Sequence, residues 1–130
     1  MDLLFVIAAA VVAWVFGALW YRLLAGPMTR LSGVQADNRG DPRSKSALPY
    51  LIHGAYLMVV ASTMRALFLR GGIEGAATGL LIGATIGTLL VTPILLMNDI
   101  HPRRPLALTL IDGGHAILIC AVMGTILAAV

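Results

Sequence analysis

Four long apolar stretches dominate this chain of 130 residues, at about residues 3–24, 50–69, 75–97 and 106–130. A bilayer core about 30 Å thick needs roughly 20 apolar residues per spanning helix, and each stretch is long enough. The chain is 59% hydrophobic and 12% charged, whereas soluble domains are about half apolar and a quarter charged. We therefore predict an all-α integral membrane protein, with residues 1–130 forming a single four-helix transmembrane domain arranged as an up-down bundle.

The distribution of basic residues predicts which side of the membrane each loop faces. With four spans, the first and third loops lie on one side, and only Arg65 and Arg70 belong to the other side. Basic loops remain in the cytoplasm. We therefore expect the polar loop at residues 26–47 to be cytoplasmic and both termini to lie outside. The basic residues on the predicted cytoplasmic side are Arg22, Arg30, Arg39, Arg43, Lys45, Arg103 and Arg104.

The first stretch ends in an aromatic pair and a cation, Trp20, Tyr21 and Arg22. Aromatic residues of this kind gather at the headgroup level of a membrane, and an arginine there can extend its side chain toward water. We expect these three residues to mark the cytoplasmic boundary of the first span.

The net charge of +3 does not require a nucleic-acid partner. In a soluble protein, clustered basic residues would indicate nucleic-acid binding. Here the cytoplasmic loops of a membrane protein account for them. We expect the lipid bilayer as a partner and no nucleic acid.

Glycines recur every four residues in the third stretch. Lipid tails are as apolar as leucine, so helices associate in a membrane through close packing and interhelical hydrogen bonds. We expect this glycine ridge to carry helix packing, against either another helix of the chain or a second copy. The ridge consists of Gly75, Gly79, Gly83 and Gly87.

The opposite face of the third stretch is rich in threonine, which suggests a helix with protein on both sides. The threonine hydroxyls could also bond to carbonyls of their own helix. Pro93 removes one backbone hydrogen bond and predicts a kink near it. The threonines are Thr78, Thr85, Thr88 and Thr92.

Polar side chains inside the spans are the candidate site residues. Counting 1.5 Å per residue from Pro49 places His53 about 6 Å and Tyr56 about 10 Å below the cytoplasmic boundary. The same count from Pro105 places Asp112 at about 10 Å and His115 at about 15 Å. If the second and fourth spans touch, the candidate intramembrane polar cluster is His53, Tyr56, Asp112 and His115.

Three interpretations of this cluster stay open. Asp112 and His115 can form a structural hydrogen-bonded group, which we expect, or they can relay protons or ions. Metal or haem ligation is the third, but the offset of about 9 Å in depth between His53 and His115 fits one haem poorly. We expect no metal site and no cofactor.

Two segments of the chain resemble a known family. The first span ends in residues 17–21 (Gly-Ala-Leu-Trp-Tyr) followed by Gly26, and the last span contains residues 111–115 (Ile-Asp-Gly-Gly-His) and 123–127 (Met-Gly-Thr-Ile-Leu). These segments resemble the opening and closing motifs of DUF1761, a family of small four-span bacterial membrane proteins without known chemistry. The resemblance implies that the protein is located in a bacterial cytoplasmic (inner) membrane. This chain has Asp112 where the family usually has asparagine.

No nucleophile, metal-ligand set or phosphate loop stands at a spacing that predicts an enzyme, so we expect no catalytic residues. We expect a scaffold or an accessory subunit of a membrane complex, associated as a homo-oligomer or with another membrane protein. The alternative is a small oligomeric transporter or proton-coupled permease that uses Asp112 and His115.

Overall fold

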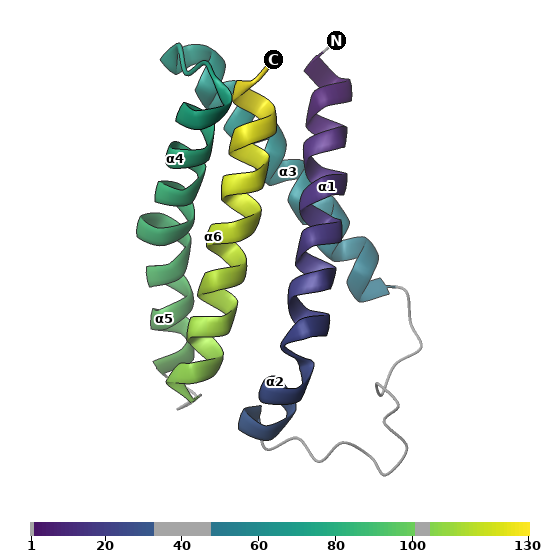
Figure 1. The fold of residues 1–130 in the computed structure, drawn as a ribbon, viewed down its shortest axis with the longest axis vertical. Helices are drawn as coiled ribbons and strands as arrows, with labels where there is room; N and C mark the ends of the chain where they lie inside the picture. The colour runs from purple at the N-terminus through teal and green to yellow at the C-terminus, as the bar shows by residue number, and fades with distance from the viewer. Residues whose placement is uncertain (1, 33–47, 101–104) are drawn as a thin grey trace.

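The computed structural model describes residues 2–32, 48–100 and 105–130, which form helices and no strand (Figure 1). The third span is a continuous run of two α-helices with a π-helical turn, η1, between them. In chain order the elements are α1 (Asp2–Leu23), α2 (Ala25–Ser32), α3 (Leu48–Gly71), α4 (Ala76–Ile86), η1 (Gly87–Val91), α5 (Thr92–Ile100) and α6 (Leu106–Ala128).

Four helical segments are long and apolar enough to cross a membrane: α1, α3, the α4–η1–α5 run and α6. They occupy the four stretches expected from the sequence, which confirms the all-α fold with four spans. Successive spans run in opposite directions, and the two termini lie at one end of the bundle while α2 lies at the other (Figure 1).

The chain after the first span differs from the sequence prediction. A loop is predicted from residue 26, but α2 occupies the beginning of this segment. Backbone hydrogen bonds from Leu24 to Trp20 and from Met28 to Leu24 carry the helical path from α1 into α2. Pro27 is tolerated because an N–H in the first turn of a helix lacks an intrahelical acceptor. The remainder of the predicted loop, residues 33–47, lies outside the described residues.

Helix α6 lies at the centre of the bundle and packs against each of the other helical segments, α1, α2, α3, α4, η1 and α5. In its most apolar window 44% of the residues are buried, against 11% in the third span. Polar residues on α6 therefore face protein rather than lipid, as ionisable residues inside membranes usually do.

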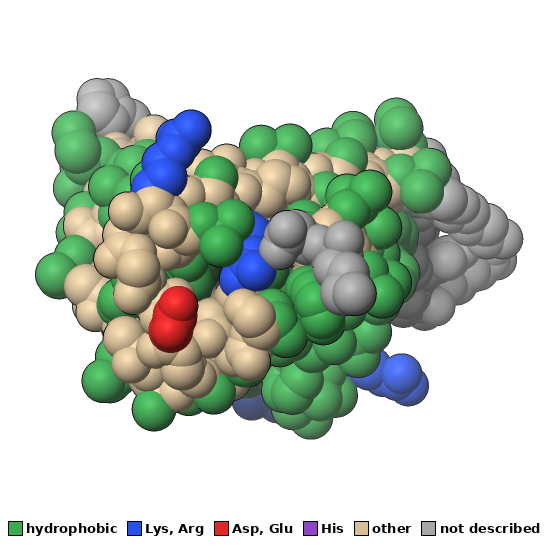
Figure 2. Space-filling view, turned by 90° about the horizontal axis from the view of Figure 1, so that it is seen from above, with side chains coloured by type: hydrophobic (Ala, Val, Ile, Leu, Met, Phe, Trp, Pro, Cys, Tyr) green, Lys and Arg blue, Asp and Glu red, His purple; other side chains and the backbone are tan. Residues whose placement is uncertain are grey.

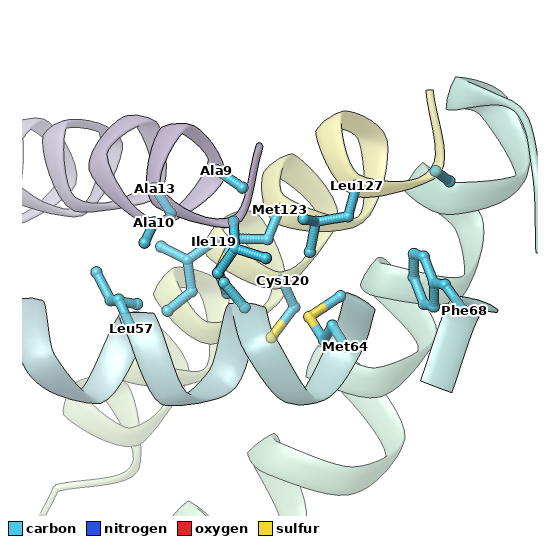
Figure 3. Packing of buried hydrophobic residues seen from close by; sticks show 13 residues of the cluster. Ala9, Ala10, Ala13, Leu57, Met64, Phe68, Ile119, Cys120, Met123 and Leu127 are labelled. Atoms are coloured by element: carbon cyan, nitrogen blue, oxygen red, sulfur yellow. The ribbon is translucent and has the colours of Figure 1, made fainter. Parts of the chain in front are cut away.

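Small residues bring α1 close to its neighbours. Ala9 and Ala13 have no exposed surface, and Figure 3 shows them directed toward the side chains of α6 and α3. Such close packing is what associates helices in a membrane. The core consists of Val6, Ala9, Ala10 and Ala13 of α1, Leu57, Ala61, Met64 and Phe68 of α3, and Ile119, Cys120, Met123, Leu127 and Ala128 of α6.

Three glycines of the predicted ridge, Gly79, Gly83 and Gly87, are buried on the third span. A Cβ atom on Gly83 would collide with the carbonyl oxygen of Cys120, and one on Gly79 with that of Gly124, both on the backbone of α6. The ridge thus contacts a helix of the same chain.

The fourth glycine of the ridge, Gly75, lies at the start of α4 instead. Its φ of 91° belongs to the left-handed region that glycine adopts without strain. Its N–H donates to the carbonyl of Ala128 at 2.7 Å, which ties the beginning of α4 to the end of α6.

The distortion expected near Pro93 takes the form of the π-helical turn η1. The N–H of Thr92 donates to the carbonyl of Gly87, five residues earlier, and the Thr92 hydroxyl donates to the same oxygen at 2.7 Å. A proline ring clashes with the carbonyl four residues before it, so a widened turn directly before Pro93 relieves that clash.

Arg65 joins α3 to the end of α6. Its guanidinium donates to the carbonyls of Leu127 at 2.6 Å and Val130 at 2.9 Å. Carbonyls at a helix C-terminus lack intrahelical partners, and a cation there is favourable. Figure 2 views this end of the bundle, where hydrophobic side chains cover most of the rim and a few charged ones lie between them.

We expect Gly83→Leu to lower the thermal midpoint of the detergent-solubilised protein strongly, because a side chain there pushes α4 away from α6. Overpacking of this kind typically costs about 1–3 kcal/mol. The control is Leu81→Ala, two residues along the same helix, where the side chain is 66% exposed and lipid or detergent replaces its contacts. Equal midpoints for the two variants would contradict a close contact at Gly83.

Candidate functional site

Two hydrogen bonds join the last turn of α1 to α6. The indole N–H of Trp20 donates to the carbonyl of Ile111 at 3.0 Å, and the hydroxyl of Tyr21 donates to Oδ1 of Asp112 at 2.8 Å. Gly114 makes room for the indole, since a Cβ there would lie 2.8 Å from the Trp20 ring. The aromatic pair expected at the headgroups is therefore half-buried against α6.

His115 lies one turn deeper on the same face of α6 and is 6% exposed. Its ring packs against that of Tyr21, with the centroids 4.6 Å apart. Its Nε2 lies against α1 at Gly17, where a Cβ would approach it to 2.6 Å. In the part of the chain that the structure describes, this Nε2 has no hydrogen-bond partner.

His53 of α3 approaches the same place from the other side. Its ring centroid lies 5.8 Å from that of His115, and its side chain is half-buried. The depth offset counted from the sequence assumes upright helices. Figure 1 shows α3 inclined across α1 and α6, and this tilt brings His53 closer to His115 than the count implies.

Tyr56 does not join these residues. Its side chain is 53% exposed, and it lines an apolar groove of about 310 Å³ between α3 and the third span. Residue 56 thus faces away from the buried face of α3, which Leu57 occupies. We call Tyr21, His53, Asp112 and His115 the polar cluster.

A hollow of about 550 Å³ lies between α1 and α3 beside the polar cluster. Two members of the cluster, Tyr21 and His53, line it, and so does Gly17, which contacts His115 from the other side. We call it the α1–α3 hollow. Its described lining residues are Trp14, Gly17, Ala18, Tyr21, Arg22, Tyr50 and His53.

The chemistry of this lining suits a small ligand. Three aromatic side chains offer faces for stacking, the imidazole of His53 can donate or accept a hydrogen bond, and the exposed guanidinium of Arg22 donates to anions. Within the described ranges, no group of three or more His, Cys, Asp or Glu side chains is placed to hold a metal ion.

Sequence reasoning placed Gly17 on a ridge of small residues along the first span, but it missed the contact of Gly17 with His115 and the inward role of Tyr21. The spacing of Ala9, Ala13 and Gly17 indicates a shallow face on α1 that a neighbouring side chain can approach. Tyrosine at the end of a span is typical of a headgroup contact, so its position alone gave no sign of the bond to Asp112.

The fold and this site define a four-span membrane protein with a polar cluster inside its helix bundle. The chain belongs to the DUF1761 family, described as a protein of unknown function, whose model matches residues 4–128. The match includes the middle of the chain, between the two segments that carry the resemblance in the sequence. No curated protein and no solved structure matches the chain.

The bond between Tyr21 and Asp112 can be measured by a double-mutant cycle of Tyr21→Phe and Asp112→Leu. Each single variant removes one partner, and we expect a coupling energy of about 0.6 kcal/mol, the average for interhelical hydrogen bonds in membranes. The measurement is unfolding free energy in mixed micelles. Strictly additive effects of the two substitutions would show that the bond contributes nothing.

Proposed function

We propose that this protein is a non-enzymatic multi-pass membrane protein that binds a small ligand in the α1–α3 hollow. The single observation that carries the proposal is His115. A buried polar atom without a hydrogen bond typically costs about 1–3 kcal/mol, and an ionisable residue inside a membrane is usually functional.

The position of His115 links it to the hollow. Gly17 lines the hollow and also contacts His115 Nε2, so the imidazole lies directly behind the wall of the hollow. Tyr21 and His53, which contact the same imidazole, line the hollow themselves. A ligand that contacts them can therefore influence the whole polar cluster.

The scaffold or accessory role stays a prediction, with weaker support than the sequence alone suggested. The glycine ridge contacts α6, and the hydroxyls of Thr85 and Thr88 donate to carbonyls of their own helix. The ridge thus has its partner inside the chain, and these two hydroxyls have theirs in their own helix. The exposed outer face of the third span still supports a homo-oligomer or another membrane protein as partner.

A proton-coupled permease is a second candidate, favoured by the connected arrangement of the polar cluster. Asp112 of α6 contacts Tyr21 of α1, Tyr21 contacts His115 of α6, and His115 contacts His53 of α3. Series of carboxylate and imidazole groups form proton pathways in membrane proteins.

The proposed location is a bacterial inner membrane with both termini outside. The basic side chains of Arg22 and Arg30 support this orientation, because α1 ends and α2 lies at the end of the bundle opposite the termini.

Binding in the hollow is tested by filling it. Ala18 lines the α1–α3 hollow, so we expect Ala18→Trp to lose a small molecule that native mass spectrometry detects on the wild-type protein from mild detergent. Leu19→Trp is the matched control, because Leu19 is 50% exposed on the same helix and does not line the hollow. Retention by Ala18→Trp, or no small molecule on the wild type, would contradict the proposal.

The permease is tested with Asp112→Asn in proteoliposomes. Asparagine keeps an oxygen that can accept the Tyr21 hydrogen bond but does not ionise, so a permease should lose its proton flux while its fold persists. Absence of proton flux in the wild-type protein, or full flux in the variant, would contradict the permease. Ligand binding in the α1–α3 hollow would then take place without proton coupling.

A further inference from the structure

A second, smaller hollow continues the first along the seam between α1 and α3. It has a volume of about 320 Å³ and shares Trp14 and Tyr50 with the α1–α3 hollow. We call it the apolar extension. Its described lining residues are Ala10, Val11, Trp14, Tyr50, Leu51, Gly54, Ala55 and Met58.

The two hollows differ in chemistry. The α1–α3 hollow carries Arg22, Tyr21 and His53. Apart from the shared Trp14 and Tyr50, the apolar extension is lined by aliphatic side chains and glycine. No acidic residue lines either one among the residues that the structure describes. The seam is therefore cationic at one end and apolar at the other.

The length of the seam matches one leaflet of a bilayer. From Ala10 to Arg22, α1 rises about 18 Å at 1.5 Å per residue, and half of a hydrocarbon core of about 30 Å is about 15 Å. Arg22 lies in the last turn of α1, so the seam begins at the end of the span and reaches the middle of the membrane.

We propose that the two hollows together hold one anionic membrane lipid, with its headgroup at Arg22 and His53 and one acyl chain along the apolar extension. This inference rests on the proposed function and names its ligand. The cation selects an anionic headgroup, since a basic residue near the membrane surface attracts anionic lipid. The apolar extension favours a hydrocarbon chain, because beyond the two aromatic residues that it shares with the α1–α3 hollow its walls are aliphatic and offer no charged group to a hydrophilic anion.

Tryptophan quenching tests this proposal in the full chain. Trp14 lines both hollows, so in a Trp20→Phe background its fluorescence reports a brominated acyl chain in the seam. The protein is reconstituted in vesicles of zwitterionic phosphatidylcholine that contain a small fraction of brominated lipid, either phosphatidylglycerol or phosphatidylcholine. We expect about fivefold preferential quenching by the anionic lipid, the order expected for one basic residue.

Two pairs of variants separate the headgroup from the chain. Arg22→Gln should abolish the preference for anionic lipid, whereas Arg30→Gln, an exposed cation of α2 outside the hollows, should keep it. Ala55→Phe should reduce quenching by both lipids because it fills the apolar extension. Ala66→Phe places the same ring on α3 away from the hollows and should leave quenching unchanged.

Two results would overturn the lipid assignment. Equal quenching by the two brominated lipids in the wild type would indicate ordinary annular contact. Loss of the preference on addition of inorganic phosphate, with the salt concentration matched, would indicate a site for a free anion. In either case the Ala18→Trp comparison decides separately whether the hollow binds a small molecule at all, so the failure of this inference is distinguishable from the failure of the proposed function.

Discussion

The close contact between the third span and α6 is the interaction on which the rest of the structure depends. At Gly79 and Gly83 the backbone of α4 lies directly on that of α6. On α6, Gly124 in turn lies against the backbone of Gly79 and Gly83. In lipid the hydrophobic effect does not drive helices together, so the free energy of association comes largely from van der Waals contacts of this kind. Any side chain at these positions would separate the two helices that form the centre of the bundle.

This contact sets the orientation of α6, and with it the position of the polar cluster. One face of α6 packs against the glycines of the third span, so Asp112 and His115 are directed toward α1. There Tyr21 donates a hydrogen bond to Asp112, and Gly17 contacts the imidazole of His115. Helix α3 then crosses the other two at an incline (Figure 1). An inclined helix packs closely at one region only, which leaves the α1–α3 hollow where the two helices diverge.

The candidate site could be predicted in part. Asp112 and His115 were evident because ionisable residues are rare inside a span, and His53 followed by the same argument. Tyr56 was grouped with His53 by helical spacing, but α3 turns its buried face toward Leu57 and leaves Tyr56 exposed. The inward position of Tyr21 was missed, because nothing local distinguishes a tyrosine that bonds to another helix from one that faces headgroups. Gly17 was expected to pack closely, but its spacing did not indicate that His115 would be its neighbour.

The sequence by itself determined the number of spans, their approximate limits and the helical class, because hydropathy and span length are local properties of the chain. It also marked the glycine ridge through its spacing. Only the tertiary structure decided that the ridge contacts α6, that Pro93 follows a π-helical turn, and that His53 lies beside His115. Tilt and rotation of a span are set by its packing against neighbouring helices, and that packing depends on residues far apart in the chain.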